Sequence, residues 1–388
     1  MLWSKNFILV CLANFLMYVA FYMLLPILPL YLSTYLNANS SIIGTILSLY
    51  TIAALCARPI AGFWVDKLSR KPTMLIFYLF YISMTISYTL ASTIVLFFII
   101  RFIHGIAYGC STVGINTMAV DIIPQEKRGV GMGVYTSFTS LAMSIGPVVS
   151  LFMFESGISF NTIFSTVFSI GLSGLILSTF IKPNNTPLKS NKHFTIGELF
   201  LKRGLPVAVV MTLLTFGYGI VTVYLSIYAR EEVGIESGTG YYFTILSIGL
   251  VASRLCSSLL LKGDRYIKVF TFGVISLIIG FFIVSFIHIP ILFFCSAAFM
   301  GLGYGLISPT AQTMIINLGE DYERGAANAT YLTFFDLGVG CGVFFGGIIA
   351  QYSNYSTAYT VGLCFTFIGL IYLLYRIKPY FYNNRLRY

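Results

Sequence analysis

The chain has 388 residues, of which 57% are hydrophobic, 16% are aromatic and only 9% are charged. This composition excludes a water-soluble globular domain, because the surface of such a domain needs far more charged residues. The formal net charge of +10 is spread over short connections without a basic domain. We therefore expect no nucleic-acid partner.

Apolar runs long enough to cross a bilayer recur along the chain. A hydrocarbon core about 30 Å thick needs roughly 20 apolar residues per helix. Such runs begin near residues 7, 42, 73, 94, 129, 160, 204, 238, 268, 290, 326 and 355. The first is too long for a signal peptide and lacks a small-residue cleavage site, so we interpret it as a retained span. The sequence predicts an all-α membrane protein with twelve transmembrane helices.

The basic residues indicate how these helices are oriented. Apart from Arg58, Arg101 and Arg254 inside the predicted spans, every Lys and Arg except Arg230 falls on one side of the predicted membrane. Cytoplasmic loops carry the excess of Lys and Arg in membrane proteins. We therefore expect both termini in the cytoplasm.

The two halves of the chain repeat each other. Adding 196 to a residue number in the first half repeatedly reaches an identical residue, and YLSTY (31–35) matches YLSIY (224–228) at an offset of 193. The pairs at 196 are Arg58 and Arg254, Gly105 and Gly301, Tyr108 and Tyr304, Gly109 and Gly305, Thr117 and Thr313, Met118 and Met314, Arg128 and Arg324, Gly129 and Gly325, Tyr135 and Tyr331, and Gly146 and Gly342. This repeat predicts six-helix bundles at 1–181 and 204–388, joined by a cytoplasmic linker at 182–203.

Parallel six-helix repeats are typical of secondary transporters, which bind substrate near the bilayer midplane between the repeats. Polar side chains at helical spacing mark the spans that line such a cavity. Tyrosine combines an apolar ring with a polar tip, which suits amphipathic substrates, although it is also common at membrane interfaces. The candidates for substrate contact are Asn14, Tyr18, Tyr22, Tyr108, Thr112, Tyr218, Thr222, Tyr304, Ser308 and Gln312.

The fourth predicted span carries two ionisable residues at membrane depth. Arg101 and His104 lie at helical spacing with Tyr108 and Thr112, among Phe, Ile, Ala and Gly. At the 196 offset the second half has Ala297 and Met300 in place of the two ionisable residues. Because charges inside a membrane are costly, we interpret Arg101 and His104 as functional additions to a shared architecture.

Several motifs resemble those of the major facilitator superfamily, over essentially the whole chain. The segment from Gly62 to Pro72, with Asp66, Lys67, Arg70 and Lys71, resembles the signature between helices 2 and 3, except that Ser69 replaces a glycine. The segment from Ala119 to Tyr135 resembles the connection of helices 4 and 5 through Asp121, Pro124 and Arg128. The segment from Ile99 to Gly109 is similar to the helix 4 motif of proton-coupled members, with His104 in place of glutamine. Gly133, Gly146 and Pro147 partly match the helix 5 motif of exporters, where Ala142 and Ser150 replace glycines.

The resemblance implies a conformational latch at the cytoplasmic ends of the helices. It places the Asp66 carboxylate against the positive N-terminus of helix 11 and brings Arg70 to Asp121. Such contacts hold the two halves together when the protein faces outward. The residues assigned to this latch are Gly62, Asp66, Arg70, Asp121 and Arg128. The alternative is that these charges only orient the helices, which explains the cations but not the two aspartates.

Asp336 is the first candidate for a proton carrier. It lies about ten residues into its predicted helix, roughly 15 Å deep at 1.5 Å per residue. Apolar surroundings stabilise the protonated form of a carboxyl, which favours proton uptake and release during transport. Arg101 and His104 then tune this carboxylate or bind substrate. The alternative is a structural carboxylate in a static ion pair or bonded to the backbone.

We therefore predict a proton-coupled exporter of drugs or metabolites, working by alternating access as a monomer in the cytoplasmic membrane of a bacterium. A short match around FFDLGVG also resembles exporters of opine-type metallophores. The main alternative is a proton symporter that imports a sugar or an organic acid. The expected partners are a small-molecule substrate, protons and the lipid bilayer.

A membrane enzyme or sensor is a remote alternative. The sequence contains neither HExxH nor GxSxG, and its three histidines and seven separated cysteines form no recognisable metal motif. No P-loop occurs, so ATP is not the direct energy source. We expect no enzymatic activity, no cofactor and no metal site.

Overall fold

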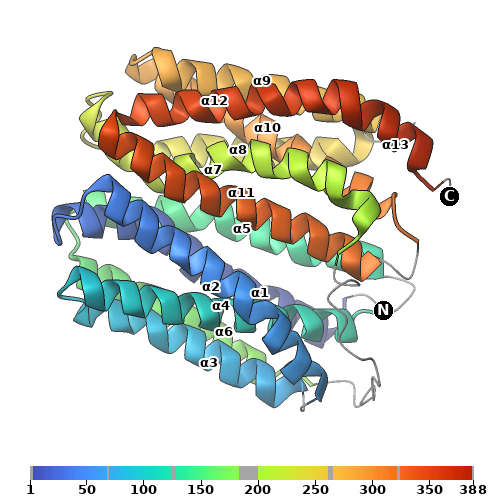
Figure 1. Ribbon diagram of the computed structural model, residues 1–388. Coiled ribbons are helices and arrows are strands. Elements are labelled where there is room, and N and C mark those ends of the chain that lie inside the picture. The colour runs from blue at the N-terminus through green and yellow to red at the C-terminus, as the bar shows by residue number, and fades with distance from the viewer. Residues whose placement is uncertain are drawn as a thin grey trace. The chain divides into compact units, whose positions relative to one another are not determined.

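The computed structural model describes residues 3–67, 70–124, 128–182, 200–260, 265–320 and 324–386, which contain helices and no strand. Figure 1 shows the long helices in chain order, from blue to red. Their bounds are α1 (Lys5–Thr34), α2 (Ser40–Lys67), α3 (Arg70–Ser87), α4 (Ile94–Ile122), α5 (Arg128–Glu155), α6 (Phe160–Thr179), α7 (Leu205–Glu231), α8 (Thr239–Leu260), α9 (Tyr266–Phe286), α10 (Pro290–Ile316), α11 (Arg324–Tyr352) and α12 (Tyr355–Tyr372).

The predicted twelve long helices are present, and each begins within three residues of its expected start. In the described residues, eleven helices are long and apolar enough to cross a membrane, and α8 is the remaining long helix. Side chains that accept hydrogen bonds from the first turn fix several of the starts. These N-caps are Ser4 before α1, Thr93 before α4, Ser159 before α6 and Asn354 before α12.

The last helix is longer than the apolar pattern indicates. Beyond α12 the helix continues through a π-helical turn at Leu373–Ile377 into α13 (Lys378–Asn384). Two short 3-10 segments complete the helical elements of the described residues, at Tyr88–Leu90 after α3 and at Lys202–Gly204 before α7.

Contacts divide the chain into two compact units. The first unit comprises Met1–Ala38 and Ile46–Lys192, and the second comprises Asn39–Thr45 and His193–Tyr388. The boundary after Lys192 falls inside the predicted linker, most of which lies outside the described residues. The sequence analysis placed residues 1–181 in one bundle. In the structure, Asn39–Thr45 at the start of α2 groups with the second unit instead.

The two units use the same pattern of helix neighbours. In the first unit α1 packs against α5 and α6, while α3 packs against α4 and α6. In the second unit α7 packs against α11 and α12, while α9 packs against α10 and α12. A helix of the first unit and the helix six places later in the chain therefore have equivalent neighbours, as expected for a structural repeat.

Two glycines of α4 bring its backbone close to that of α2. A β-carbon at Gly105 would lie only 2.5 Å from the carbonyl oxygen of Tyr50. One at Gly109 would lie 2.5 Å from the carbonyl oxygen of Ala54. Real β-carbons do not approach so closely, so glycine is required at both positions for this helix contact.

The second unit repeats this contact at the 196 offset. A β-carbon at Gly301 would meet the carbonyl oxygen of Leu246, and one at Gly305 would lie 2.6 Å from that of Leu250. The offset that relates the glycines also relates Tyr50 to Leu246 and Ala54 to Leu250. The repeat is therefore one of contacts as well as of sequence.

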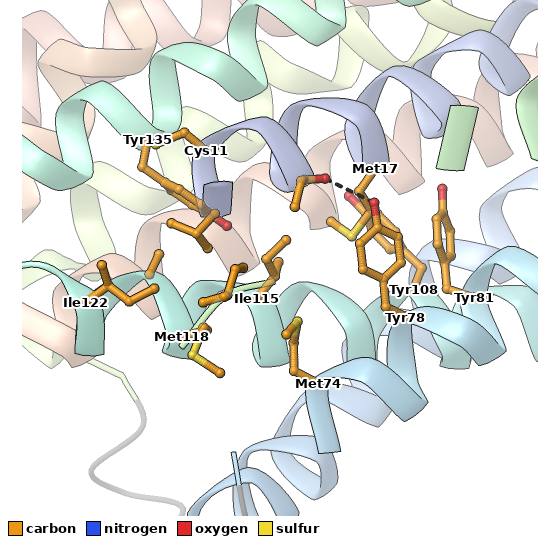
Figure 2. Packing of buried hydrophobic residues seen from close by; sticks show 14 of the residues in the cluster. Cys11, Met17, Met74, Tyr78, Tyr81, Tyr108, Ile115, Met118, Ile122 and Tyr135 are labelled. Carbon is orange, nitrogen blue, oxygen red and sulfur yellow. Dashed lines mark hydrogen bonds between the residues drawn. The ribbon is translucent and has the colours of Figure 1, made fainter. Parts of the chain in front are cut away.

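The core of the first unit is built mainly from α1, α3 and α4. Figure 2 shows Tyr78 and Tyr81 projecting from α3, next to Tyr108. The Tyr78 hydroxyl donates a hydrogen bond to the carbonyl oxygen of Ala13 in α1, over 3.0 Å. A buried hydroxyl is thereby satisfied by the backbone of a neighbouring helix.

Gly301→Ala is expected to lower the free energy of unfolding by about 1–3 kcal/mol, because the methyl group forces α10 away from α8. Thermal unfolding of the purified protein in detergent measures the effect as a lower melting temperature.

Gly362→Ala is the matched control for this substitution. Its β-carbon would lie 3.3 Å from the nearest atom, Cα of Gly217, so the neighbour needs to give only slightly. Both substitutions gain the same helix propensity. Equal melting temperatures for the two variants would contradict the packing argument.

Candidate functional site

The ionisable residues of α4 lie in the interior of the protein. Arg101 is 2% exposed and His104 is 0% exposed, and the side chains of Tyr108 and Thr112 on the same helix are also buried. The Thr112 hydroxyl donates a hydrogen bond to the carbonyl oxygen of Gly109 over 3.0 Å. The stripe expected from the sequence therefore faces inward.

A short hydrogen-bond network joins Arg101, Tyr88 and His104. Arg101 Nη1 donates to Tyr88 Oη over 3.2 Å, and the same hydroxyl lies 2.7 Å from His104 Nδ1. The tyrosine oxygen has two lone pairs, so beside the bond from Arg101 it either donates its proton to Nδ1 or accepts from Nδ1, according to the imidazole tautomer. In the tautomer in which Nδ1 accepts, Nε2 carries the hydrogen.

Aromatic rings enclose this network. Arg101 Cζ lies 3.8 Å from the centroid of the Tyr50 ring, a cation–π contact. His104 stacks on Tyr81 with centroids 4.9 Å apart, and the edge of its ring contacts Tyr50 at 5.3 Å. Tyr108 packs against Tyr50 at 5.3 Å. The rings come from α2, α3 and α4, so several helices build this site.

The sequence analysis missed three members of the site. Tyr50, Tyr81 and Tyr88 lie on other helices, at positions with no helical spacing to Arg101 or His104. The internal repeat holds a signal that the three share, because each is replaced by an aliphatic residue at the 196 offset, although Tyr78 outside the site is replaced by Val274 in the same way. The replacements are Leu246 for Tyr50, Leu277 for Tyr81 and Val284 for Tyr88.

The proposed substrate contacts on α1 divide into two kinds. Asn14 is fully buried and is engaged with α5, because its Nδ2 donates to Thr139 Oγ1 over 2.9 Å and its Oδ1 accepts from Tyr135 Oη at 2.7 Å. Tyr18 and Tyr22 are half-buried and stack with centroids 6.0 Å apart. Asn14 thus joins two helices in this structure, whereas the two tyrosines form an aromatic surface.

The exporter-like motif of α5 lies at its contact with α1. A β-carbon at Gly146 would lie 2.7 Å from Cβ of Tyr22. Pro147 follows inside the continuous helix. The equivalent Gly342 in α11 makes the same approach to Phe216 in α7. Gly146 therefore sets a helix contact that both units share.

Candidate residues of the second unit form a separate aromatic group. Tyr218 and Tyr304 contact each other with ring centroids 4.8 Å apart, and Tyr304 Oη donates to the carbonyl oxygen of Leu214 over 3.1 Å. Thr222 is buried and bonded to its own helix, as Thr112 is in the first unit. Ser308 hydrogen-bonds with Tyr331, and Gln312 is half-buried on α10.

Asp336 is half-buried in the middle of α11. It lies within electrostatic reach of Tyr331, which is also within reach of Arg254. Arg254 acts on Tyr218 as well. The charges of Asp336 and Arg254 therefore both act on Tyr331 in the second unit.

The expected contact of Arg70 with Asp121 forms in the structure. Their side chains make an ion pair and are 22% and 20% exposed. Gly62 and Asp66 lie in α2, and Arg128 begins α5, but the side chains of Asp66 and Arg128 lie outside the described part of the structure. The contact of Asp66 with helix 11 stays a prediction.

Asp121→Asn is expected to lower the melting temperature by removing the charge that faces Arg70. The loss corresponds to about 1 kcal/mol, because the pair is partly exposed to solvent. The swap of Arg70→Asp with Asp121→Arg restores the attraction, and thermal unfolding of the three variants measures both effects.

Lys71→Ala provides a control for a cation at the same helix end. Lys71 Nζ donates to the carbonyl oxygen of Thr179 over 2.6 Å, so its removal breaks a bond to the backbone rather than an ion pair. A swap variant no more stable than Asp121→Asn would show that the ion pair contributes nothing.

Comparisons with known proteins agree with this architecture. The sequence model of the Major Facilitator Superfamily matches residues 10–269 and 262–386. Multidrug resistance protein 1 of Bacillus subtilis is 21% identical over 360 residues, which cover 89% of this chain and 90% of that protein. Staphylopine export protein of Staphylococcus aureus is 21% identical over 345 residues, covering 84% and 85%.

A solved structure shows the same fold. A mutant of the nucleoside transporter NupG matches with a TM-score of 0.77 at 15% identity, over 95% of this chain and 99% of that chain. The spacing of the motifs, the repeated helix contacts and a family match over almost the whole chain lead to one assignment: the protein belongs to the Major Facilitator Superfamily of transporters.

Proposed function

We propose that the protein exports small organic solutes, drugs or metabolites, in exchange for protons by alternating access. The observation that carries this proposal is the asymmetry of the repeat. The first unit has a buried guanidinium and imidazole at Arg101 and His104, where the second unit has Ala297 and Met300. A duplicated scaffold that carries costly ionisable groups in one copy has them for binding or coupling.

Asp336 is the proposed proton carrier. A carboxyl group inside a helix bundle takes up and releases a proton as its surroundings change between apolar and aqueous. The charge of Asp336 acts on Tyr331, which the charge of Arg254 also influences. A coupled transporter needs a group whose charge depends in this way on the state of the protein.

The direction of transport is proposed from the relatives. Two relatives are named for multidrug resistance and for the export of staphylopine, and both match most of the chain. The Gly146 and Pro147 motif in α5 also resembles that of exporters. We place the protein in the cytoplasmic membrane of a bacterium, as a monomer with both termini in the cytoplasm, because the Lys and Arg residues gather on one side.

The conformational latch is part of this proposal. The ion pair of Arg70 with Asp121 ties the start of α3 to the end of α4 within the first unit. We propose that it holds the turn after α2 so that Asp66 meets the N-terminus of helix 11 in the outward-facing state. Gly62 and Arg128 flank the same region of the sequence.

A second candidate function is import of a sugar or an organic acid together with protons. The similarity in fold to a nucleoside transporter favours it. The two functions predict opposite directions of substrate movement under the same proton gradient, which distinguishes them directly.

Asp336→Asn is expected to abolish proton-driven exchange in reconstituted vesicles, because the amide cannot carry a proton. Substrate flux under an imposed pH gradient falls to that of protein-free vesicles, while exchange of substrate without a gradient continues. Movement of substrate and protons in the same direction would instead establish the importer.

Glu232→Gln is the matched control in the second unit. The Glu232 carboxylate accepts hydrogen bonds from the backbone nitrogens of Tyr355, at 2.6 Å, and Ser356, at 3.0 Å, at the start of α12. This variant is expected to lower the melting temperature and to leave coupling intact. Normal coupling in Asp336→Asn would make that carboxylate structural.

A further inference from the structure

In the part of the chain that the structure describes, the buried charge of Arg101 has no carboxylate partner. Among the described residues, no carboxylate forms an ion pair with Arg101, whose contacts are the Tyr88 hydroxyl and the Tyr50 ring. Asp121, on the same helix, lies twenty residues farther along, about 30 Å away at 1.5 Å per residue. An uncompensated charge in a buried site is costly, so a partner from outside the chain would stabilise it.

Four buried polar atoms around this charge have no hydrogen-bond partner in the described part of the chain. They are Arg101 Nε, His104 Nε2, Tyr50 Oη and Tyr81 Oη. Arginine only donates, and both tyrosine hydroxyls have a proton to donate. His104 Nε2 donates in the tautomer in which Nδ1 accepts from Tyr88. Three of the four atoms therefore offer hydrogen-bond donors, and His104 Nε2 offers a fourth in that tautomer.

The side chains that carry these atoms adjoin one another in the first unit, and the Arg101 guanidinium lies over the Tyr50 ring. Tyr50 and Tyr81 lie within electrostatic reach of each other and of Arg101. His104 stacks on the Tyr81 ring and contacts the Tyr50 ring. A positive charge beside several unpartnered donors suits an anion.

The fold does not require this arrangement. At the 196 offset the second unit has Leu246, Leu277, Ala297 and Met300, all at most 4% exposed, in place of Tyr50, Tyr81, Arg101 and His104. The second unit nevertheless keeps the close approach of α10 to α8 that α4 makes to α2 in the first unit. Since apolar residues support the same packing, the first unit retains these polar groups for a ligand.

We propose that this site binds the carboxylate of an amphipathic organic anion, which makes such anions the substrate class of the exporter. This inference rests on the proposed function and specifies its substrate. A singly charged carboxylate balances the single charge of Arg101, whereas a phosphate dianion leaves a buried negative charge. The rings of Tyr50, Tyr81 and Tyr108 supply the flat apolar surface that the rest of the solute contacts.

The test compares 1-naphthaleneacetate with 1-naphthaleneacetamide, which differ in charge but hardly in shape. The intact protein is purified in detergent, and its melting temperature is measured over a range of each compound. The carboxylate is expected to raise the melting temperature in a saturable way and the amide is not, because binding to the native state stabilises it.

Variants then identify the groups that bind. Tyr81→Phe and Tyr50→Phe each remove one donor to a charged acceptor and are expected to weaken carboxylate binding about tenfold. Arg101→Met removes the charge and abolishes the preference for the carboxylate. Tyr78→Phe is the matched control, because the Tyr78 hydroxyl is already bonded to Ala13, and it leaves carboxylate binding unchanged.

A double variant introduces two residues of the second unit at the equivalent positions of the first unit. Arg101→Ala combined with His104→Met installs the residues found at Ala297 and Met300 and is expected to fold but not to bind the carboxylate. If it does not fold, the two tyrosine variants, which change only one hydroxyl each, decide the question.

Several results would overturn the inference. These are equal stabilisation by acid and amide, none by either, unchanged binding in Tyr81→Phe and Tyr50→Phe, or inorganic phosphate competing as well as the carboxylate. Binding is measured without a gradient, so intact binding with no proton-driven export would overturn the proposed function alone. Export of uncharged solutes without carboxylate binding would overturn the substrate class alone.

Discussion

The constraint on which this structure depends is that hydrocarbon offers no hydrogen-bond partner. Backbone groups must therefore be paired within helices, and hydroxyl groups must find an acceptor on the protein. Even on the exposed face of α6, Thr166 donates to the carbonyl oxygen of Thr162 and Ser173 to that of Ser169, both over 2.9 Å. Among the described residues, Ser226, Ser285 and Tyr359 also have buried hydroxyls without a partner, but around Arg101 four such atoms occur on adjoining side chains.

The internal repeat separates what the fold needs from what function adds. Both units place glycines of the fourth helix against the backbone of the second, and both pack the first helix against the fifth through a glycine. Equivalent contacts survive although the side chains around them differ. The aromatic and cationic residues around Arg101 belong to one unit only. The free energy that their burial costs is therefore not required to form this fold.

The ionisable groups are distributed unequally between the two units. The first unit holds Arg101 and His104, and the second holds Asp336 in the middle of α11. Binding an anion and carrying a proton are tasks with opposite electrostatic needs, because one requires a fixed positive charge and the other a charge that changes.

The sequence by itself determined the membrane class, the twelve helices, the register of the repeat and the pairing of Arg70 with Asp121. The first three follow from run lengths, charge and repeated residues, whereas the pairing is what the resemblance of the motifs to those of the superfamily implies. Only the tertiary structure decided that Tyr50, Tyr81 and Tyr88 surround Arg101 and His104, and that Asn14 is engaged with α5. Those contacts join residues from different helices. They depend on the rotation of each helix about its axis, which is set by close packing between glycines and neighbouring backbones.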